Sequence, residues 1–315
     1  LLSRGLGDVY KRQTLGGKDL TPEELGELLS NGDGLIRFKG EWVRVDARKV
    51  RDLMDRWTQA ARMMSSLGIP LVQGLRMLVN GPSVQLVQIP EPDEDCVMEP
   101  GQNLRQTLDI LAGKVPVSIP ELPSRLDALM RPYQKEGFSF LYRITERGFG
   151  ACLADDMGLG KTLQAIAWLD ALRRKGRLEG LPALIVAPAS LLSNWKEEAQ
   201  RFAPELILRI MHPSSPDPWQ PEKNLRRKDC HAVITTYGMA ARTSALADLH
   251  FPAIILDEAQ AIKNAGSARS RAIRSLHGER RIALSGTPVE NNLNELWSLM
   301  EFLNPGLLGL SLIHI

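Results

Sequence analysis

The sequence has few cysteines and no long apolar run, and each shortage removes a class of protein. Cys96, Cys152 and Cys230 lie far apart in 315 residues and lack the CxxC spacing of a structural zinc site. We therefore expect reduced thiols. Apolar runs such as 183–187 and 253–256 are far shorter than the roughly 20 residues that span a bilayer. The sequence predicts no membrane segment, no signal peptide and a cytoplasmic setting.

An excess of either charge is also missing. Lys and Arg number 39 and Asp and Glu number 37, which gives a net charge of +2. Any surface for nucleic acid must come from local clustering, so the net charge neither supports nor excludes such a partner. We interpret the basic runs 173–175 and 226–228 as solvated surface. The length allows about two domains.

The two ends of the sequence read as foreign to the rest. Residues 8–13 can be back-translated into a DNA sequence whose reverse complement encodes residues 310–315. That DNA resembles the transposase end used in sequencing-library adapters. We predict that residues 1–13 and 310–315 are adapter-derived artefacts and that the chain is a fragment. A parent reading frame that encodes these residues internally would contradict this prediction.

A proline-rich stretch divides the remaining sequence. Seven prolines and an acidic run lie from Pro82 to Pro123, a composition that resists a continuous helix or a central strand. The elements expected near it are a helix over 21–29, a hairpin over 35–45, a helix over 46–68 and a short helix over 104–111. This part predicts a small α+β domain followed by a linker.

From about Ser124 short apolar strands alternate with amphipathic helices. The strand candidates are 151–154, 183–187, 232–235, 253–256 and 281–284. This alternation predicts an α/β fold, a parallel sheet with helices on both faces. Ligands in such folds bind at the carboxyl ends of the strands, so we expect the functional site in the loops that follow them.

A glycine-rich loop follows the first of these strands. It reads Asp155-Asp156-Met157-Gly158-Leu159-Gly160-Lys161-Thr162. Glycines let backbone N–H groups turn onto phosphate oxygens, the next helix directs its positive end at them, and the lysine and threonine add a cation and a hydroxyl for Mg²⁺. Asp155 stands where the strict pattern GxxxxGK[ST] has glycine. An ordinary Gly-Leu-Gly turn therefore stays open for this loop alone.

Two adjacent carboxylates follow the strand candidate 253–256. Asp257 and Glu258 fit a Walker-B role, in which Asp257 holds Mg²⁺ and Glu258 orients the attacking water. Phosphoryl transfer needs this positioning and charge neutralisation more than covalent help. On its own the pair is better explained as a solvated acidic turn after a strand.

Together these loops resemble the Snf2 family of superfamily 2 helicase-like ATPases, in its bacterial type with an N-terminal SNF2-associated domain. The resemblance covers about residues 125–309, and its motifs are RPYQ at 131–134, the loop 155–162, APASL at 187–191 with Asn194-Trp195, TTY at 235–237, DEAQAIKN at 257–264 and LSGTPVENNLNELW at 284–297. Asp155 is usual in this family. The resemblance implies a RecA-like helicase ATP-binding domain over 118–309 and an accessory domain over 14–117.

The resemblance also implies a role for each matching residue, with ATP and Mg²⁺ as cofactors. The ATP-binding residues are Arg131, Tyr133, Gln134, Asp156, Met157, Gly158, Leu159, Gly160, Lys161 and Thr162; the Mg²⁺ ligands are Thr162 and Asp257; the catalytic residues are Lys161, Asp257 and Glu258. Gln260, Ser285 and Thr287 are implied to couple the nucleotide state to DNA-facing loops, although Ser285 and Thr287 could simply satisfy a turn. The implied DNA contacts are Pro188, Ser190, Leu191, Thr235, Thr236, Lys263 and Asn264. We interpret Trp195 and Trp297 as core anchors.

The function implied is that of an ATP-dependent translocase or remodeller that hydrolyses ATP on double-stranded DNA without reading its sequence, in the bacterial cytoplasm at the nucleoid, with a protein partner on DNA as a further option. The chief alternative is an ATP-gated recycling factor that acts on a protein–nucleic-acid complex such as RNA polymerase. In the family, arginines of a second lobe complete the ATP site. We expect this chain to hold only the first motor lobe, with the second lobe beyond the point where the adapter-derived residues begin. We therefore expect it to bind nucleotide weakly and to hydrolyse it poorly.

Overall fold

The chain forms two compact units, residues 1–115 and 116–315, in the computed structural model. The residues that the structure describes are 14–15, 18–19, 34–38, 41–45, 102–111, 114–115, 118–224, 230–287 and 293–308. Among these residues no helix is both long and apolar enough to cross a membrane.

The described part of the first unit consists of two strand pairs and a helix. β1 (Thr14–Leu15) pairs antiparallel with β2 (Lys18–Asp19), β3 (Gly34–Phe38) pairs antiparallel with β4 (Glu41–Val45), and α4 spans Gln102–Leu111. The pair β3–β4 agrees with the predicted hairpin, and α4 agrees with the predicted short helix. The helices predicted over 21–29 and 46–68 lie outside the described residues.

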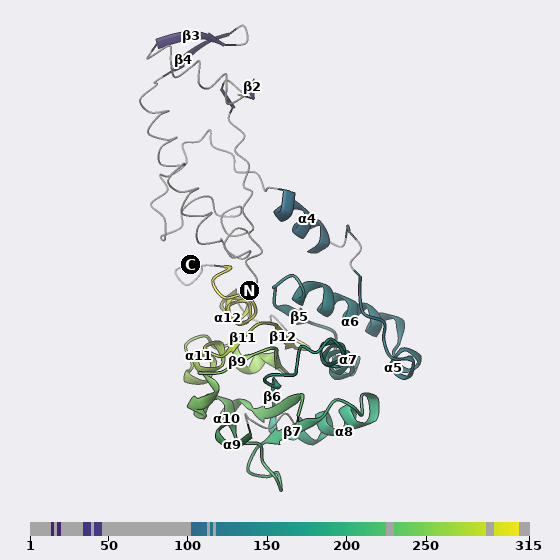
Figure 1. Cartoon of the computed structure of the whole chain (residues 1–315). Helices are drawn as coiled ribbons and strands as arrows, with labels where there is room; N and C mark the ends of the chain where they lie inside the picture. Colours follow the sequence, from purple (N-terminus) through teal and green to yellow (C-terminus); the bar gives the residue numbers. More distant parts are fainter. Residues whose placement is uncertain are drawn as a thin grey trace. The chain divides into compact units, whose positions relative to one another are not determined.

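The second unit is built on a six-stranded parallel sheet (Figure 1). Its strands lie in the order β5 (Ala151–Leu153), β12 (Arg281–Leu284), β10 (Ile254–Leu256), β6 (Ala183–Ala187), β8 (Ala232–Thr236) and β7 (Leu208–Met211). β6, β10 and β12 are buried along their whole length, which is why they consist almost entirely of Ala, Val, Ile and Leu. The five predicted strands are confirmed to within one residue, whereas β7 is an additional strand.

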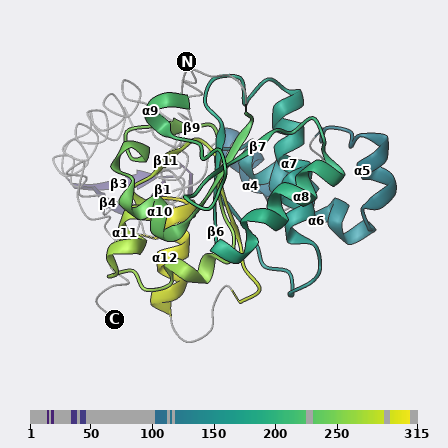
Figure 2. The same ribbon diagram turned by 90° about the horizontal axis from the view of Figure 1, so that it is seen from below.

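Helices cover both faces of this sheet (Figure 2), which confirms the predicted α/β class. One face carries α6 (Pro132–Thr145), α7 (Lys161–Arg174) and α8 (Leu192–Phe202), and the other carries α10 (Tyr237–Arg242), α11 (Ala268–Arg274) and α12 (Leu293–Leu303). The shorter elements are α5 (Ser124–Leu129), α9 (Pro221–Asn224), the parallel pair β9 (His250–Phe251) and β11 (His277–Gly278), and the 3₁₀ turns η1 (Ala189–Leu191), η2 (Ser244–Leu246) and η3 (Ala259–Ile262).

Helix α7 is embedded in the protein, and residues 163–172 of it are all buried. Gly137 on α6 permits this close packing, because a Cβ added there would lie 1.7 Å from the side-chain oxygen of Gln164 on α7. The loop that precedes α7 is therefore mounted on a rigid element.

The basic run at the end of α7 is bound to a buried carboxylate. Asp170, whose side chain is only 4% exposed, accepts hydrogen bonds from Nε of Arg173 at 3.0 Å and Nε of Arg174 at 3.1 Å. Lys175 contacts the hydroxyl of Tyr142. This corrects the interpretation of residues 173–175 as simply solvated, while residues 226–228 lie outside the described part of the chain.

We expect Asp170→Asn to lower the free energy of unfolding by about 2 kcal/mol, because the amide removes the charge that both guanidinium groups bind. Urea unfolding followed by circular dichroism measures this change. Asp127→Asn is the control: Asp127 is 56% exposed and pairs with Lys135 at 2.7 Å, so its loss should cost less than about 1 kcal/mol. Equal losses in the two variants would contradict the prediction.

Candidate nucleotide-binding site

The glycine-rich loop connects β5 to α7, and its lysine hydrogen-bonds back to the start of the loop. Nζ of Lys161 donates to the carbonyl oxygens of Asp155 at 2.7 Å and Asp156 at 3.1 Å. Gly158 and Gly160 have φ angles of 83° and 79°, which side chains other than glycine rarely adopt. The lysine thus already lies over the loop whose N–H groups would face phosphate oxygens.

Asp155 does not face the phosphate cradle as a free carboxylate. Its Oδ2 accepts a hydrogen bond from Nε2 of Gln164 at 2.9 Å, and Gln164 is fully buried on α7. A glycine at position 155 could not make this bond. Asp155, which departs from the strict loop pattern, therefore has a hydrogen-bond partner in Gln164 that the pattern does not include.

Gln134 joins helix α6 to the same loop. Its Oε1 accepts from the backbone N–H of Arg131 at 3.0 Å, and its Nε2 donates to the carbonyl of Leu159 at 3.0 Å. A Cβ at Gly160 would lie 2.5 Å from that Nε2, so a larger residue there would also displace the Gln134 amide. Each end of the amide keeps capacity for one further hydrogen bond. Tyr133 lies beside it and is 37% exposed.

Asp257 follows β10, an inner strand of the sheet, and hydrogen bonds hold both its carboxylate and its backbone. Its Oδ2 accepts from the indole Nε1 of Trp195 at 2.7 Å, and its Oδ1 accepts from the backbone N–H of Glu258 at 3.0 Å. The hydroxyl of Tyr237 donates to its carbonyl oxygen at 2.8 Å. Asp257 is 5% exposed. Its carboxylate is therefore fixed before any ligand binds.

The charges around Asp257 suit a divalent cation. Burial is the main cause that raises the pKa of Asp257, and the neighbouring Glu258 raises it further. The pKa of Glu198 on α8 is also raised, first by burial and also by Asp257. Asp257 is buried and the two glutamates are half-buried. Such a group of negative charges is stabilised by Mg²⁺, which takes few protein carboxylates and keeps waters and phosphate oxygens as its other ligands. Asp257 and the hydroxyl of Thr162 are the side chains that the sequence predicts as its ligands.

Glu258 has a left-handed backbone conformation. Its φ of 51° is the only positive value among the described residues other than glycine. Such a conformation costs a residue with a Cβ about 1–2 kcal/mol, and strain of this kind concentrates at functional sites. The turn sends the chain directly from β10 into η3 and directs the carboxylate of Glu258 toward Gln260.

This strain predicts a difference between two variants that both lack the carboxylate. We expect Glu258→Gly to be about 1 kcal/mol more stable toward unfolding than Glu258→Ala, because only glycine adopts a positive φ without steric cost. Urea denaturation of both variants tests this. At exposed Glu197 on helix α8 the same pair should show the opposite order, since glycine is the poorer helix former. Equal stability of the two variants at position 258 would contradict the strain.

A chain of side-chain hydrogen bonds leads from Glu258 to the loop after β12. Nε2 of Gln260 donates to Oε2 of Glu258 at 2.5 Å, and Oγ of Ser285 donates to Oε1 of Gln260 at 3.1 Å. The same Oγ accepts from the backbone N–H of Thr287 at 3.1 Å. Ser285 thus satisfies its turn and also contacts Gln260, and its coupling role stays a prediction. Thr287 takes part through its backbone.

The residues expected to contact DNA divide into those near the surface and those whose side chains already bond within the protein. Pro188, Ser190 and Leu191 lie in or beside η1, directly after β6, and Ser190 is exposed. Thr235 is fully buried and its hydroxyl donates to the carbonyl of Met211 at 2.8 Å, so its side chain is used inside the protein, which corrects its expected role as a side-chain contact. Thr236 caps α10 by accepting from the N–H of Met239.

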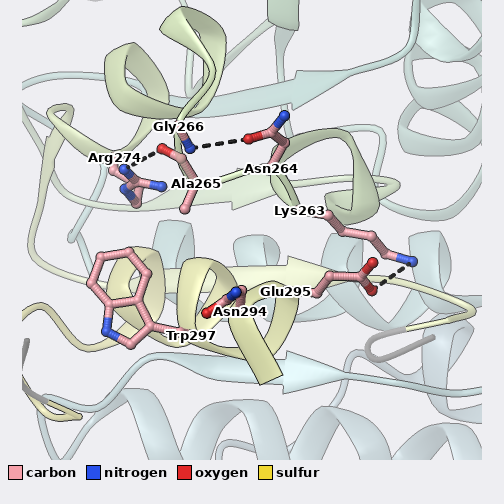
Figure 3. Close-up of a pocket in the computed structure, with 8 residues that line it drawn as sticks. All are labelled: Lys263, Asn264, Ala265, Gly266, Arg274, Asn294, Glu295 and Trp297. Carbon is pink, nitrogen blue, oxygen red and sulfur yellow. Dashed lines mark hydrogen bonds and ion pairs between the residues drawn. The ribbon is translucent and has the colours of Figure 1, made fainter. Parts of the chain in front are cut away.

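Lys263 and Asn264 line a cavity of about 650 Å³ beside α12 (Figure 3). Nζ of Lys263 lies 3.6 Å from a carboxylate oxygen of Glu295, so this lysine faces the protein rather than solvent, while Asn264 is exposed. Arg274 holds the loop that follows Asn264, because it donates to the carbonyl of Ala265 at 2.9 Å and its guanidinium carbon lies 5.4 Å from the centre of the Trp297 ring.

Three contacts at this site could not be found from the motifs. The indole of Trp195 was interpreted only as a core anchor, yet it binds Asp257. The bonds from Tyr237 to Asp257 and from Gln164 to Asp155 join residues 20 and 9 positions apart, respectively. Each contact is made by the polar end of a side chain that packs in the core. The sequence offered one indication of them: Trp195 and Tyr237 lie inside family motifs.

Known families and proteins match both parts of the chain. A family model described as SNF2-related domain matches residues 133–311, and one described as SNF2 Helicase protein matches residues 6–79. The first range includes residues 310–311 and the second residues 6–13 of the ends that we predict to be adapter-derived, and the origin of those ends stays a prediction.

YwqA of Bacillus subtilis (strain 168) is 37% identical over 310 residues, which cover 96% of this chain and 33% of YwqA. The chromatin-remodeling ATPase INO80 of Vanderwaltozyma polyspora is 41% identical over 197 residues, covering 59% of this chain and 12% of that protein. The solved Sulfolobus solfataricus SWI2/SNF2 ATPase core in complex with dsDNA is 41% identical, with a TM-score of 0.54 over 61% of this chain and 39% of that one. The chain spans about a third of the length of YwqA. From the family match over more than half of its residues, together with the parallel sheet and the loops at its carboxyl edge, we conclude that this chain belongs to the Snf2 family.

Proposed function

We propose that this chain carries the first motor lobe of an ATP-dependent, double-stranded-DNA translocase or remodeller. The observation that carries the proposal is the hydrogen-bonded path from Glu258 through Gln260 to Ser285, at the same edge of the sheet as the glycine-rich loop. Such a path can make the position of the water-orienting carboxylate depend on a neighbouring loop. A function that only bound nucleotide would not require it.

In this proposal the residues of the site divide the work of ATP hydrolysis. Arg131, Tyr133 and Gln134 bind the adenine, and the backbone from Asp156 to Thr162 holds the phosphates with the Lys161 ammonium. Thr162 and Asp257 would hold Mg²⁺, which would neutralise phosphate charge. Glu258 orients the attacking water, because hydrolysis needs an in-line nucleophile more than a strong base.

The DNA contacts in the proposal are made to the backbone. Pro188, Ser190, Leu191, Thr236 and Asn264 offer hydroxyl, amide and backbone groups of the kind that bind phosphates, which position a protein on DNA without reading sequence. Lys263 would join them only after leaving Glu295, with which it is paired here. Support comes from the solved Snf2-type relative, whose structure is a complex with dsDNA.

We further propose that a second lobe lies in a longer protein that contains this chain, and that residues 14–117 are an accessory domain. The short share of YwqA and of the solved core that the chain covers supports the first point, and the match of residues 6–79 to an SNF2 Helicase family supports the second.

The decisive experiment measures ATP hydrolysis by the longer protein with and without duplex DNA of several sequences, followed by displacement of a third strand from a triplex. We expect stimulation by every duplex and strand displacement that requires ATP. Stimulation that requires a protein such as RNA polymerase, with none from naked DNA, would overturn the proposal in favour of a recycling factor. Binding of this chain to duplex DNA should weaken as salt rises, as phosphate contacts require.

A further inference from the structure

We infer that Trp195 is a positioning residue for the Mg²⁺ site, because its indole N–H fixes the carboxylate of Asp257 in the orientation that binds the ion. The inference rests on the proposed function, in which Asp257 holds Mg²⁺. Trp195 lies on α8, 62 positions before Asp257, and its side chain is fully buried.

Hydrogen bonds to both oxygens restrict rotation of the Asp257 carboxylate. Each carboxylate oxygen accepts one hydrogen bond, from Trp195 at 2.7 Å and from the N–H of Glu258 at 3.0 Å. The bond from the Tyr237 hydroxyl to the carbonyl of Asp257 holds the backbone of the same residue. A carboxylate oxygen has two lone-pair sites, so each oxygen keeps one for a magnesium ion or its water. Loss of the indole N–H frees the carboxylate to rotate.

An indole is well suited to this task. It is a donor only and carries no charge at any pH, so it orients the carboxylate without placing a cation next to the Mg²⁺ site. A lysine or arginine in the same place would compete with the ion. Hydrogen bonds to a carboxylate are about twice as strong as those between neutral groups, and partners behind a metal ligand typically change metal affinity about 10- to 100-fold when they are removed.

Trp168 shows that the bond to Asp257 is not needed merely to satisfy a buried indole. It is as completely buried as Trp195, and its Nε1 donates to the neutral hydroxyl of Thr145 at 3.0 Å. A neutral acceptor is therefore sufficient for a buried tryptophan of this lobe. The two residues also form a matched pair of equal type and equal burial, of which one contacts the predicted Mg²⁺ ligand.

The test is a Mg²⁺ titration of the binding of a fluorescent ATP analogue to this chain. For Trp195→Phe we expect the Mg²⁺ concentration at half-maximal binding to rise at least tenfold, with the affinity measured in excess EDTA unchanged within about twofold. Trp168→Phe should leave both quantities at their wild-type values. Wild-type Mg²⁺ dependence in Trp195→Phe would overturn the inference and leave the proposed function standing. Failure of the wild-type chain to bind the analogue would overturn the proposed function and the inference with it.

A second variant separates the hydrogen bond from the packing. Benzothienylalanine at position 195, introduced at an amber codon, replaces the indole N–H by sulfur and keeps the shape of the ring. It should reproduce the shift in Mg²⁺ dependence while the midpoint of thermal unfolding stays closer to that of the wild type than in Trp195→Phe. Normal Mg²⁺ dependence in this variant would mean that the N–H has no role.

Discussion

Lys161→Ala is expected to weaken the binding of ATP to this chain about 10- to 100-fold. The Lys161 ammonium already lies over the glycine-rich loop, where it donates to the carbonyls of Asp155 and Asp156. A bound phosphate would replace these acceptors by charged oxygens. Hydrogen bonds to charged groups contribute about 1.5–3 kcal/mol, and 1.4 kcal/mol corresponds to a factor of ten in affinity.

Titration of the fluorescent analogue, in competition with unlabelled ATP, measures this loss. Lys114→Ala is the matched control, because Lys114 belongs to the other compact unit, is 72% exposed and pairs with Asp109 at 3.4 Å. Both variants remove one positive charge, so an effect of overall charge would appear in both. Unchanged affinity in Lys161→Ala would contradict the assignment of the loop to the phosphates.

The buried strands could be predicted because burial on both faces leaves a simple composition. Every residue of β6 and β12 is buried, and the predicted bounds of both strands are confirmed. β7 gave no such signal. It lies at the edge of the sheet, its two middle residues are half-buried, and Arg209 within it pairs with Asp217 at 2.8 Å. The arginine interrupts the apolar run that marks the fully buried strands.

Sequence reasoning located the loops of the site but not all of the roles within them. The parallel sheet brings the carboxyl ends of β5, β10 and β12 together, so loops far apart in sequence meet for a topological reason. The depth of each side chain depends on packing instead. Thr235, the penultimate residue of β8, is turned inward to the carbonyl of Met211, a direction that its motif does not specify. The pairing of Trp195 with Asp257 depends on how α8 lies against the sheet.

Glu258→Gln is expected to reduce DNA-stimulated ATP turnover about 100- to 1000-fold in the longer protein that we propose. Glutamine keeps the size of the side chain, and its oxygen can still accept from Gln260, which donates to Glu258 at 2.5 Å. The neutral amide orients and polarises the attacking water less well than a carboxylate, because it is uncharged and can present an N–H in place of an acceptor. Removal of a positioned proton acceptor typically costs about two to four powers of ten in rate. Binding and hydrolysis should therefore separate.

The separation is the sharpest test of the role of Glu258. The affinity of this chain for Mg²⁺-ATP should stay within about twofold of the wild-type value in Glu258→Gln, whereas Lys161→Ala loses affinity. Glu279→Gln is the control, because Glu279 is 67% exposed and pairs with Arg280 at 3.0 Å, so its turnover should be normal. If Glu258→Gln lost Mg²⁺-ATP binding as severely as Lys161→Ala, Glu258 would act in binding the nucleotide and its assignment to the attacking water would be wrong.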